Sequence, residues 1–151
     1  MKKIITFILI TIPWFISVLF IKSDPRFYQS LNLPPFAPPS IVFGIVWTVL
    51  YLLISYSIFL IIKDFKKESL KDYFLYLIIN YVSNQLFTFF FFNLQNIFLA
   101  FVDTIVVLLS SLFLYYETKS LNDKSSKFLI PYVIWNLFAT ILIMSIYFMN
   151  F

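Results

Sequence analysis

The sequence predicts an all-α integral membrane protein folded as a bundle of five transmembrane helices. Of the 151 residues, 62% are hydrophobic and only 12% are charged, whereas soluble domains carry roughly 25% charged residues. A soluble fold of this length needs a polar surface, and the chain lacks the residues to build one. The chain also has a single glycine, which argues against β-barrels and loop-rich folds because their turns use glycine.

Five apolar segments are long enough to cross a bilayer, which takes about 20 residues of α-helix. None of them contains Lys or Arg, and they cover about 4–21, 41–62, 73–92, 97–116 and 128–149. No small-residue cleavage site of a signal peptide follows the first segment, and its residues Trp14 and Phe20 are bulky, so we interpret that segment as a retained helix. We therefore treat 1–151 as one transmembrane domain with a proline-rich outer loop at 22–40.

The basic residues predict the orientation. All of the eleven Lys and Arg residues except Lys22 and Arg26 fall at the N-terminus, in the second loop or in the fourth loop. Cytoplasmic loops carry the excess of Lys and Arg. The N-terminus is therefore expected in the cytoplasm, with the C-terminus and the first loop outside. Because the basic residues sit at helix ends, membrane topology explains them better than nucleic-acid binding does.

The first loop holds five of the seven prolines: Pro25, Pro34, Pro35, Pro38 and Pro39. Proline fixes φ and restrains the residue before it, so the second half of this loop is expected to be stiff and not helical. A linker between neighbouring helices needs only about 2–8 residues. The loop is either a rigid linker or a lid over the outer mouth of the bundle, and its length favours the lid.

Two amides and one acid inside the apolar segments are candidates for a functional site. Asn80 and Asn84 are four residues apart and share one helix face, which Phe87 and Phe91 continue. The amides either hold helices together or contact a ligand. Asp103 is the one acid within the five segments, and an intramembrane acid indicates a functional site by default.

Large aromatic side chains recur at helical spacing. Trp47 and Tyr51 are four residues apart, and Trp135 and Ala139 repeat that spacing. Both tryptophans lie deeper than an interfacial belt requires. They either pack in the core or form the wall of a site for a flat, mostly apolar ligand.

Several classes of chemistry are not expected. The chain has no Cys and no His, which excludes disulfides and the commonest metal ligand. There is no nucleophile–base set and no glycine-rich phosphate loop, so we predict no metal and no conventional catalytic residues.

The order of these motifs resembles the translocator protein family, also called TspO, tryptophan-rich sensory protein or peripheral-type benzodiazepine receptor. The resemblance rests on 27–39 (FYQSLNLPPFAPP), on Trp47 and Tyr51, on Asn80 and Asp103, and on 131–139 (PYVIWNLFA). It covers nearly the whole chain. Where the family has lysine before the first proline this chain has Leu33, and where it has tryptophan before the Pro-Pro pair it has Phe36.

The resemblance implies a five-helix bundle, commonly a homodimer in the lipid bilayer, with a pocket beneath the first loop. It implies a receptor or sensor that binds porphyrins such as protoporphyrin IX, and benzodiazepine-type ligands, with no required cofactor. The tail, 146–151, has no basic residue, so the family's cholesterol motif is not supported. The residues expected to contact ligand are Tyr28, Pro38, Trp47, Tyr51, Asn80, Asn84, Phe87, Phe90, Asp103, Trp135 and Ala139.

Two alternatives stay open at this point. One is an enzyme that degrades porphyrin with light and oxygen, with Trp47 and Trp135 as redox partners. The other is a transporter of tetrapyrroles or other small molecules, although five helices without paired inverted halves do not resemble a known transporter design.

Overall fold

The computed structural model describes residues 2–20, 25–64 and 70–151, and every regular element in these ranges is a helix. Residue 21 of the first expected helix, residues 22–24 of the loop, and Lys66 and Lys67 lie outside the described ranges. The elements are α1 (Lys2–Thr11), η1 (Ile12–Phe15), α2 (Ile16–Phe20), α3 (Pro25–Ser30), α4 (Ser40–Asp64), α5 (Lys71–Thr88), η3 (Phe89–Asn93), α6 (Ile97–Leu121), α7 (Asp123–Ser126), η4 (Lys127–Leu129) and α8 (Ile130–Asn150).

Four helical stretches in the described part of the chain are long and apolar enough to cross a membrane. They are Ser40–Asp64, Lys71–Asn93, Ile97–Leu121 and Asp123–Asn150. In lipid no water is available to hydrogen-bond the backbone, so an uninterrupted helix is the stable form of such segments. Hydroxyl groups also find partners inside the helices, as when Thr48 Oγ1 donates to the Gly44 carbonyl at 2.8 Å. The chain is thus a multi-pass membrane protein.

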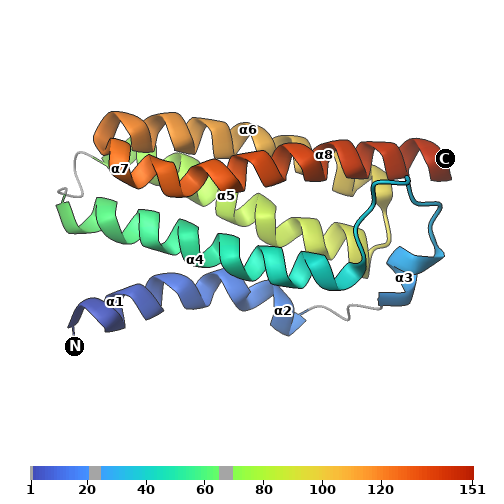
Figure 1. Cartoon of the computed structure of the whole chain (residues 1–151), viewed down its shortest axis with the longest axis horizontal. Coiled ribbons are helices and arrows are strands. Elements are labelled where there is room, and N and C mark those ends of the chain that lie inside the picture. Colours follow the sequence, from blue (N-terminus) through green and yellow to red (C-terminus); the bar gives the residue numbers. More distant parts are fainter. Residues whose placement is uncertain (1, 21–24, 65–69) are drawn as a thin grey trace.

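The first apolar segment is divided into α1, the 3₁₀ turn η1 and α2. Pro13 lies in this turn, and proline has no N–H for the α-helical hydrogen bond. Figure 1 shows α1 and α2 following one another along α4. Because of this interruption, the first segment is not one of the four long uninterrupted helices.

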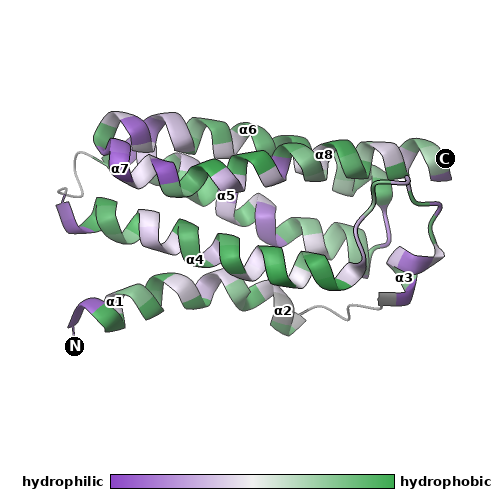
Figure 2. Ribbon diagram, in the orientation of Figure 1, coloured by the Kyte–Doolittle hydropathy of each residue, from purple (hydrophilic) through white to green (hydrophobic). Residues whose placement is uncertain are grey.

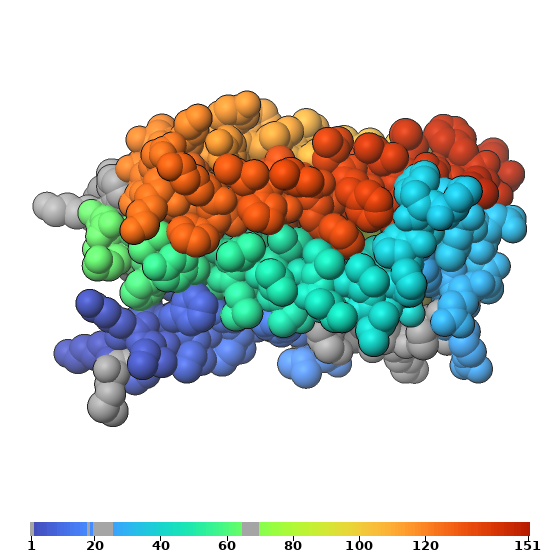
Figure 3. Space-filling view, viewed as in Figure 1, coloured from blue at the N-terminus to red at the C-terminus, as the bar shows by residue number. Residues whose placement is uncertain are grey.

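The long helices form one bundle with the termini at opposite ends (Figure 1). α6 lies between α5 and α8, while α1 packs on α4. Figure 3 shows α4 at the surface between α1 and α8. Figure 2 shows hydrophobic residues along the length of the helices and hydrophilic ones gathered near the ends. Such all-round apolar helices are typical of lipid-facing bundles.

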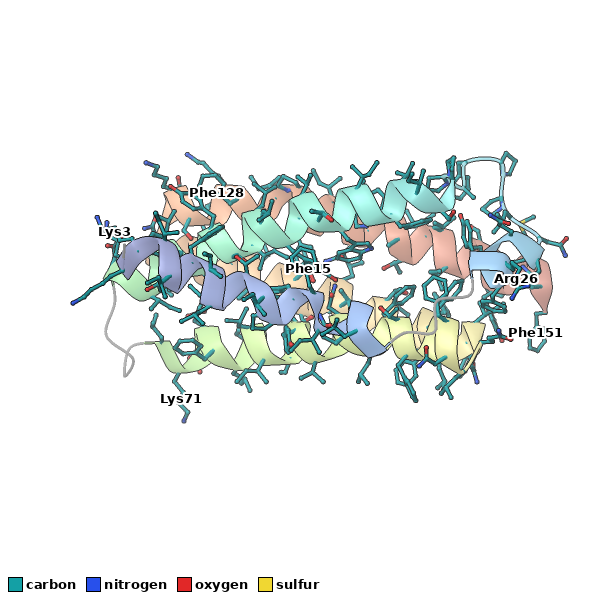
Figure 4. All side chains as sticks on the ribbon, turned by 90° about the horizontal axis from the view of Figure 1, so that it is seen from below. Lys3, Phe15, Arg26, Lys71, Phe128 and Phe151 are labelled. Atoms are coloured by element: carbon teal, nitrogen blue, oxygen red, sulfur yellow. The ribbon has the colours of Figure 1, made fainter. Side chains whose placement is uncertain are left out.

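Two clusters of buried side chains form the core. The first lies around Trp14, Tyr51 and Tyr132. The second lies nearer the first loop and contains Tyr28, Phe91 and the α8 residues Leu142, Ile143 and Ile146. In Figure 4, Lys3 and Lys71 project at one end of the bundle, whereas Arg26 and Phe151 lie at the other.

Helix α5 ends in a π-helical turn, η3. The Leu94 N–H donates to the Phe89 carbonyl at 3.0 Å, five residues back. A π turn advances more residues per turn than an α-helix, so it changes which side chains face inward. Asn96 then caps α6 by accepting from the Leu99 N–H at 2.9 Å, which satisfies one of the free donors at the helix start.

Candidate functional site

A large cavity lies in the half of the bundle nearer the first loop. Its volume is about 610 Å³, within the range of about 300–1,000 Å³ usual for ligand pockets. α3 contributes Tyr28, α4 contributes Phe43 and Trp47, and the α5–η3 helix contributes Phe87 and Phe91. The walls are therefore mainly aromatic.

A smaller cavity of about 40 Å³ extends this space between α6 and α8. Five residues line both cavities: Phe43, Trp47, Asn84, Phe87 and Ile143. The smaller cavity is lined in addition by Thr104 of α6 and by Trp135, Asn136 and Ala139 of α8. The two cavities together form one two-lobed pocket.

Ring contacts fix the aromatic walls. The rings of Trp47 and Tyr51 lie 5.4 Å apart at 35°, and Phe87 stacks on Phe91 at 5.6 Å and 10°. Phe43 meets Trp135 of α8 edge to face at 6.1 Å. Pairs at these separations are stabilising beyond the area they bury, so the walls are set before any ligand arrives.

A chain of hydrogen bonds runs beneath the pocket and joins four helices. The Tyr51 hydroxyl donates to Asn84 Oδ1 at 2.8 Å, and Asn84 Nδ2 donates to the Tyr132 oxygen at 3.4 Å. The Tyr132 hydroxyl donates to Asn80 Oδ1 at 2.8 Å, and Asn80 Nδ2 donates to Ser110 Oγ at 3.0 Å. All five side chains are buried. Asn80 therefore holds helices together, while Asn84 serves both the network and the pocket wall.

Several buried polar atoms have no hydrogen-bond partner in the described part of the chain. They include Trp135 Nε1, Asn136 Nδ2 and Asp103 Oδ2. Trp135 and Asn136 line the small lobe, and Asp103 precedes Thr104, which lines it too. Unpaired buried polar groups cost stability, and such groups concentrate at functional sites.

The first loop is tied down over the large lobe. The Tyr28 hydroxyl donates to the Pro38 carbonyl at 3.0 Å, and its ring meets Phe43 at 5.4 Å. Burial raises the pKa of the Tyr28 phenol, so the hydroxyl stays protonated and keeps donating. At the far side of the loop the Asn32 N–H donates to Asn150 Oδ1 at 2.8 Å, and Asn150 Nδ2 donates to the Asn32 carbonyl at 2.9 Å.

The structure brings seven of the eleven expected contact residues to the two-lobed pocket. They are Tyr28, Trp47, Tyr51, Asn84, Phe87, Trp135 and Ala139. Four do not line it. Asn80 lies in the network below, Asp103 is buried beside the small lobe, Pro38 contributes its carbonyl to the loop, and Phe90 packs in the second core cluster.

The expected contact residues left out other lining residues, chiefly Phe43, Phe91 and Asn136, although Phe91 was expected on the same helix face as Asn84 and Phe87. Helical spacing contained a signal for each. Phe43 precedes Trp47 by four residues, Phe91 follows Phe87 by four, and Asn136 follows Tyr132 by four. Residues four apart share a helix face, so each of these could have been placed beside a residue already expected at the site.

Acidic side chains do not gather anywhere in residues 2–20, 25–64 and 70–151 in a way that would hold a metal ion. The polar groups at the pocket are amides, hydroxyls and indole N–H groups. These groups donate and accept hydrogen bonds, so the pocket is suited to a flat organic ligand with few polar atoms.

Comparison with known proteins shows similarity over the full length. The model of the TspO/MBR family matches residues 4–149. The "Tryptophan-rich protein TspO" of Bacillus cereus is 36% identical over 152 residues, covering 99% of each chain. The "Uncharacterized membrane protein YtaB" of Bacillus subtilis is 35% identical over 127 residues, which is 84% of this chain and 82% of that one. The "Tryptophan-rich protein TspO" of Archaeoglobus fulgidus is 32% identical over 136 residues, covering 85% and 83%.

Proposed function

Because this chain belongs to the TspO/MBR family, we propose that it is a membrane receptor or sensor that binds porphyrins, such as protoporphyrin IX, in the two-lobed pocket. The same pocket would take benzodiazepine-type ligands. The observation that carries the proposal is the cavity of about 610 Å³ with Trp47, Phe87 and Phe91 in its walls. Aromatic walls of this kind suit a flat macrocycle.

The polar edge of a porphyrin also finds partners in this pocket. Ser40 at the start of α4 and Thr88 at the end of α5 line the large lobe near the loop, as does Ser17 of α2. Their hydroxyl groups can donate to propionate oxygens. Under this proposal the macrocycle lies against the tryptophans, its propionates point toward the first loop, and the loop acts as a lid.

A titration with protoporphyrin IX in darkness tests the function. A porphyrin held beside Trp47 or Trp135 accepts the excitation energy of the indole, so tryptophan emission should fall and saturate at one porphyrin per chain. Free N-acetyltryptophanamide in the same detergent controls for light absorbed by the porphyrin. Quenching that rises without saturation, or that equals this control, would refute the proposal.

The enzymatic alternative has one observation in its favour. Trp47 and Trp135 both line the small lobe, which would place two oxidisable indoles at a bound porphyrin. Illumination in air separates this activity from binding. A degrading enzyme gives a new absorbing product that disappears when either tryptophan is replaced by phenylalanine, whereas a pure receptor gives none.

We further propose five membrane crossings, with α1, η1 and α2 as the first, a cytoplasmic N-terminus, and a homodimer as in the family. The basic side chains support the orientation. Lys2, Lys3, Lys63, Lys71 and Lys119 belong to the helix ends that gather at the N-terminal end of the bundle (Figure 4). An excess of positive charge is typical of the cytoplasmic side.

Cysteine labelling tests the orientation in this cysteine-free chain. Ser30 is exposed beside the loop, so Ser30→Cys should react with an impermeant thiol reagent in intact cells. Ser125 would be a poor inner probe because it is fully buried and bonded to Ser57. Exposed Lys124 replaces it, and Lys124→Cys should react only after the cells are permeabilised. The reverse pattern would show that the N-terminus is outside.

A further inference from the structure

Contacts of the described part of the first loop, 25–40, fasten it over the loop end of the pocket. Tyr28 is 5% exposed and lies between the Pro38 carbonyl and the Phe43 ring. The paired hydrogen bonds of Asn32 and Asn150 fasten the loop to the end of α8. A ligand that entered from water on this side would have to break these contacts.

One side of the pocket is lined by exposed residues. Ile41, Gly44 and Thr48 of α4 line the large lobe and keep exposed surface. These positions are three and four residues apart and therefore lie on one helix face. Ile41 is 71% exposed although it lines the cavity, so we take this face of α4 as the mouth of the cavity, beside Gly44. A Cβ added at Gly44 would meet nothing within 4 Å.

The rim of this opening is apolar and lies at membrane depth. Ile41 is 71% exposed, and the Thr48 hydroxyl is already bonded to the Gly44 carbonyl. Thr48 is eight residues into α4, which is about 12 Å at 1.5 Å per residue. The hydrocarbon core is about 30 Å thick, so the opening faces lipid tails in the half of the bilayer nearer the first loop.

We propose that ligand passes between the bilayer and the pocket through this side opening, while the first loop stays closed. The ligand class that fits is a flat amphiphile dissolved in the membrane, which enters edge first past Gly44. This inference rests on the proposed function, because it concerns the route to the same pocket. It assigns Gly44 the role of keeping the entrance wide.

A phenylalanine at residue 44 tests the entrance. In lipid nanodiscs, stopped-flow mixing with protoporphyrin IX should show Gly44→Phe slowing association and dissociation by the same factor, about tenfold for an added barrier of about 1.4 kcal/mol. Gly44 also lines the large lobe, so the ratio of the two rates is the second readout. A ring that acts in the passage slows both rates equally, whereas faster dissociation alone would show a damaged wall and count against the entrance. Ile45→Phe is the matched control, since Ile45 is 60% exposed on the next position and lines neither lobe.

A cross-linked loop tests the other route. Asn32→Cys with Asn150→Cys puts the chain's only two thiols at positions that hydrogen-bond directly. When these thiols are joined by oxidation, or by a short bis-maleimide where the disulfide does not form, association should proceed at the rate of the reduced sample. A cross-link that stops association, or Gly44→Phe rates equal to the parent's, would overturn the side entrance.

Equilibrium titration of the same samples separates the two proposals. If the parent chain binds porphyrin but Gly44→Phe associates and dissociates at the parent's rates, only the route is refuted. A parent chain that binds no porphyrin refutes the proposed function and the route with it.

Discussion

Replacing Asn80 with leucine is expected to lower the free energy of unfolding by about 1–3 kcal/mol, the cost of leaving a buried polar partner unsatisfied. Asn80 is fully buried, accepts from the Tyr132 hydroxyl at 2.8 Å and donates to Ser110 Oγ at 3.0 Å. Leucine has similar volume, so the loss comes from the hydrogen bonds more than from packing. The Tyr132 hydroxyl loses the acceptor for its proton, and leucine offers no replacement, although the Tyr132 oxygen still accepts from Asn84 Nδ2.

A double-mutant cycle with Tyr132→Phe isolates the bond between the two side chains. The coupling energy is expected at about 0.6–1.7 kcal/mol, the range found for hydrogen bonds between membrane helices. The double variant should therefore lose less stability than the two single variants together. Reversible unfolding in dodecyl sulfate gives the free energy of unfolding of the two single variants and of the double variant.

Ser145→Ala is the control for this cycle, because the Ser145 hydroxyl donates to the Ile141 carbonyl of its own helix in an exposed hydrogen bond. It should unfold like the parent. Strict additivity of Asn80→Leu and Tyr132→Phe would show that the two side chains touch without stabilising one another.

Helix-level features were predictable from the sequence because their causes are local. Apolar length alone indicates the stretches that contain α4, α5, α6 and α8. The division of the first segment at Pro13 had a visible signal, but membrane helices often tolerate proline. The short helix α3, inside the proline-rich loop, had no periodic signal because it spans only Pro25–Ser30.

The site was predictable where spacing and resemblance coincided, as at Trp47, Asn84 and Trp135. Phe90 was among the expected contact residues and Phe91 was not, whereas the structure places Phe91 in the wall of the large lobe. Both are near Phe87 in an ordinary α-helix, but the π turn at Phe89–Asn93 changes the register. A turn with a five-residue hydrogen bond keeps the residue four positions on in line and rotates the one three positions on away. The run of four phenylalanines carries no local sequence signal that would predict a π turn.

Asn80 and Asp103 show the other limit of sequence reasoning. Each was correctly expected inside the bundle, and each is buried. The spacing of residues in the sequence indicates which face of a helix a residue lies on. Whether that residue is level with a cavity depends on how the neighbouring helices are shifted along their axes. Asn80 lies one turn farther from the loop than Asn84, which is enough to place it under the pocket instead of in its wall.

Phenylalanine in place of Trp47 or Trp135 is expected to weaken protoporphyrin binding about five-fold at each position. Both indoles line the small lobe, and Trp47 also lines the large one. Losing an indole removes stacking of roughly 1 kcal/mol, and 1.4 kcal/mol corresponds to a tenfold change in affinity. The two losses should multiply in the double variant if the indoles act independently.

Trp14 is the remaining tryptophan and the control for binding. It lines neither lobe, but it is 2% exposed and packs against Tyr51 at 5.5 Å and Tyr81 at 5.2 Å. Trp14→Phe should therefore lower the stability of the bundle while leaving the affinity per folded chain near that of the parent. Dark titrations in nanodiscs, with the folded fraction measured in the same samples, give both quantities. Equal affinities in all three single variants would mean that the aromatic walls only pack the core, and the porphyrin site would have to lie elsewhere.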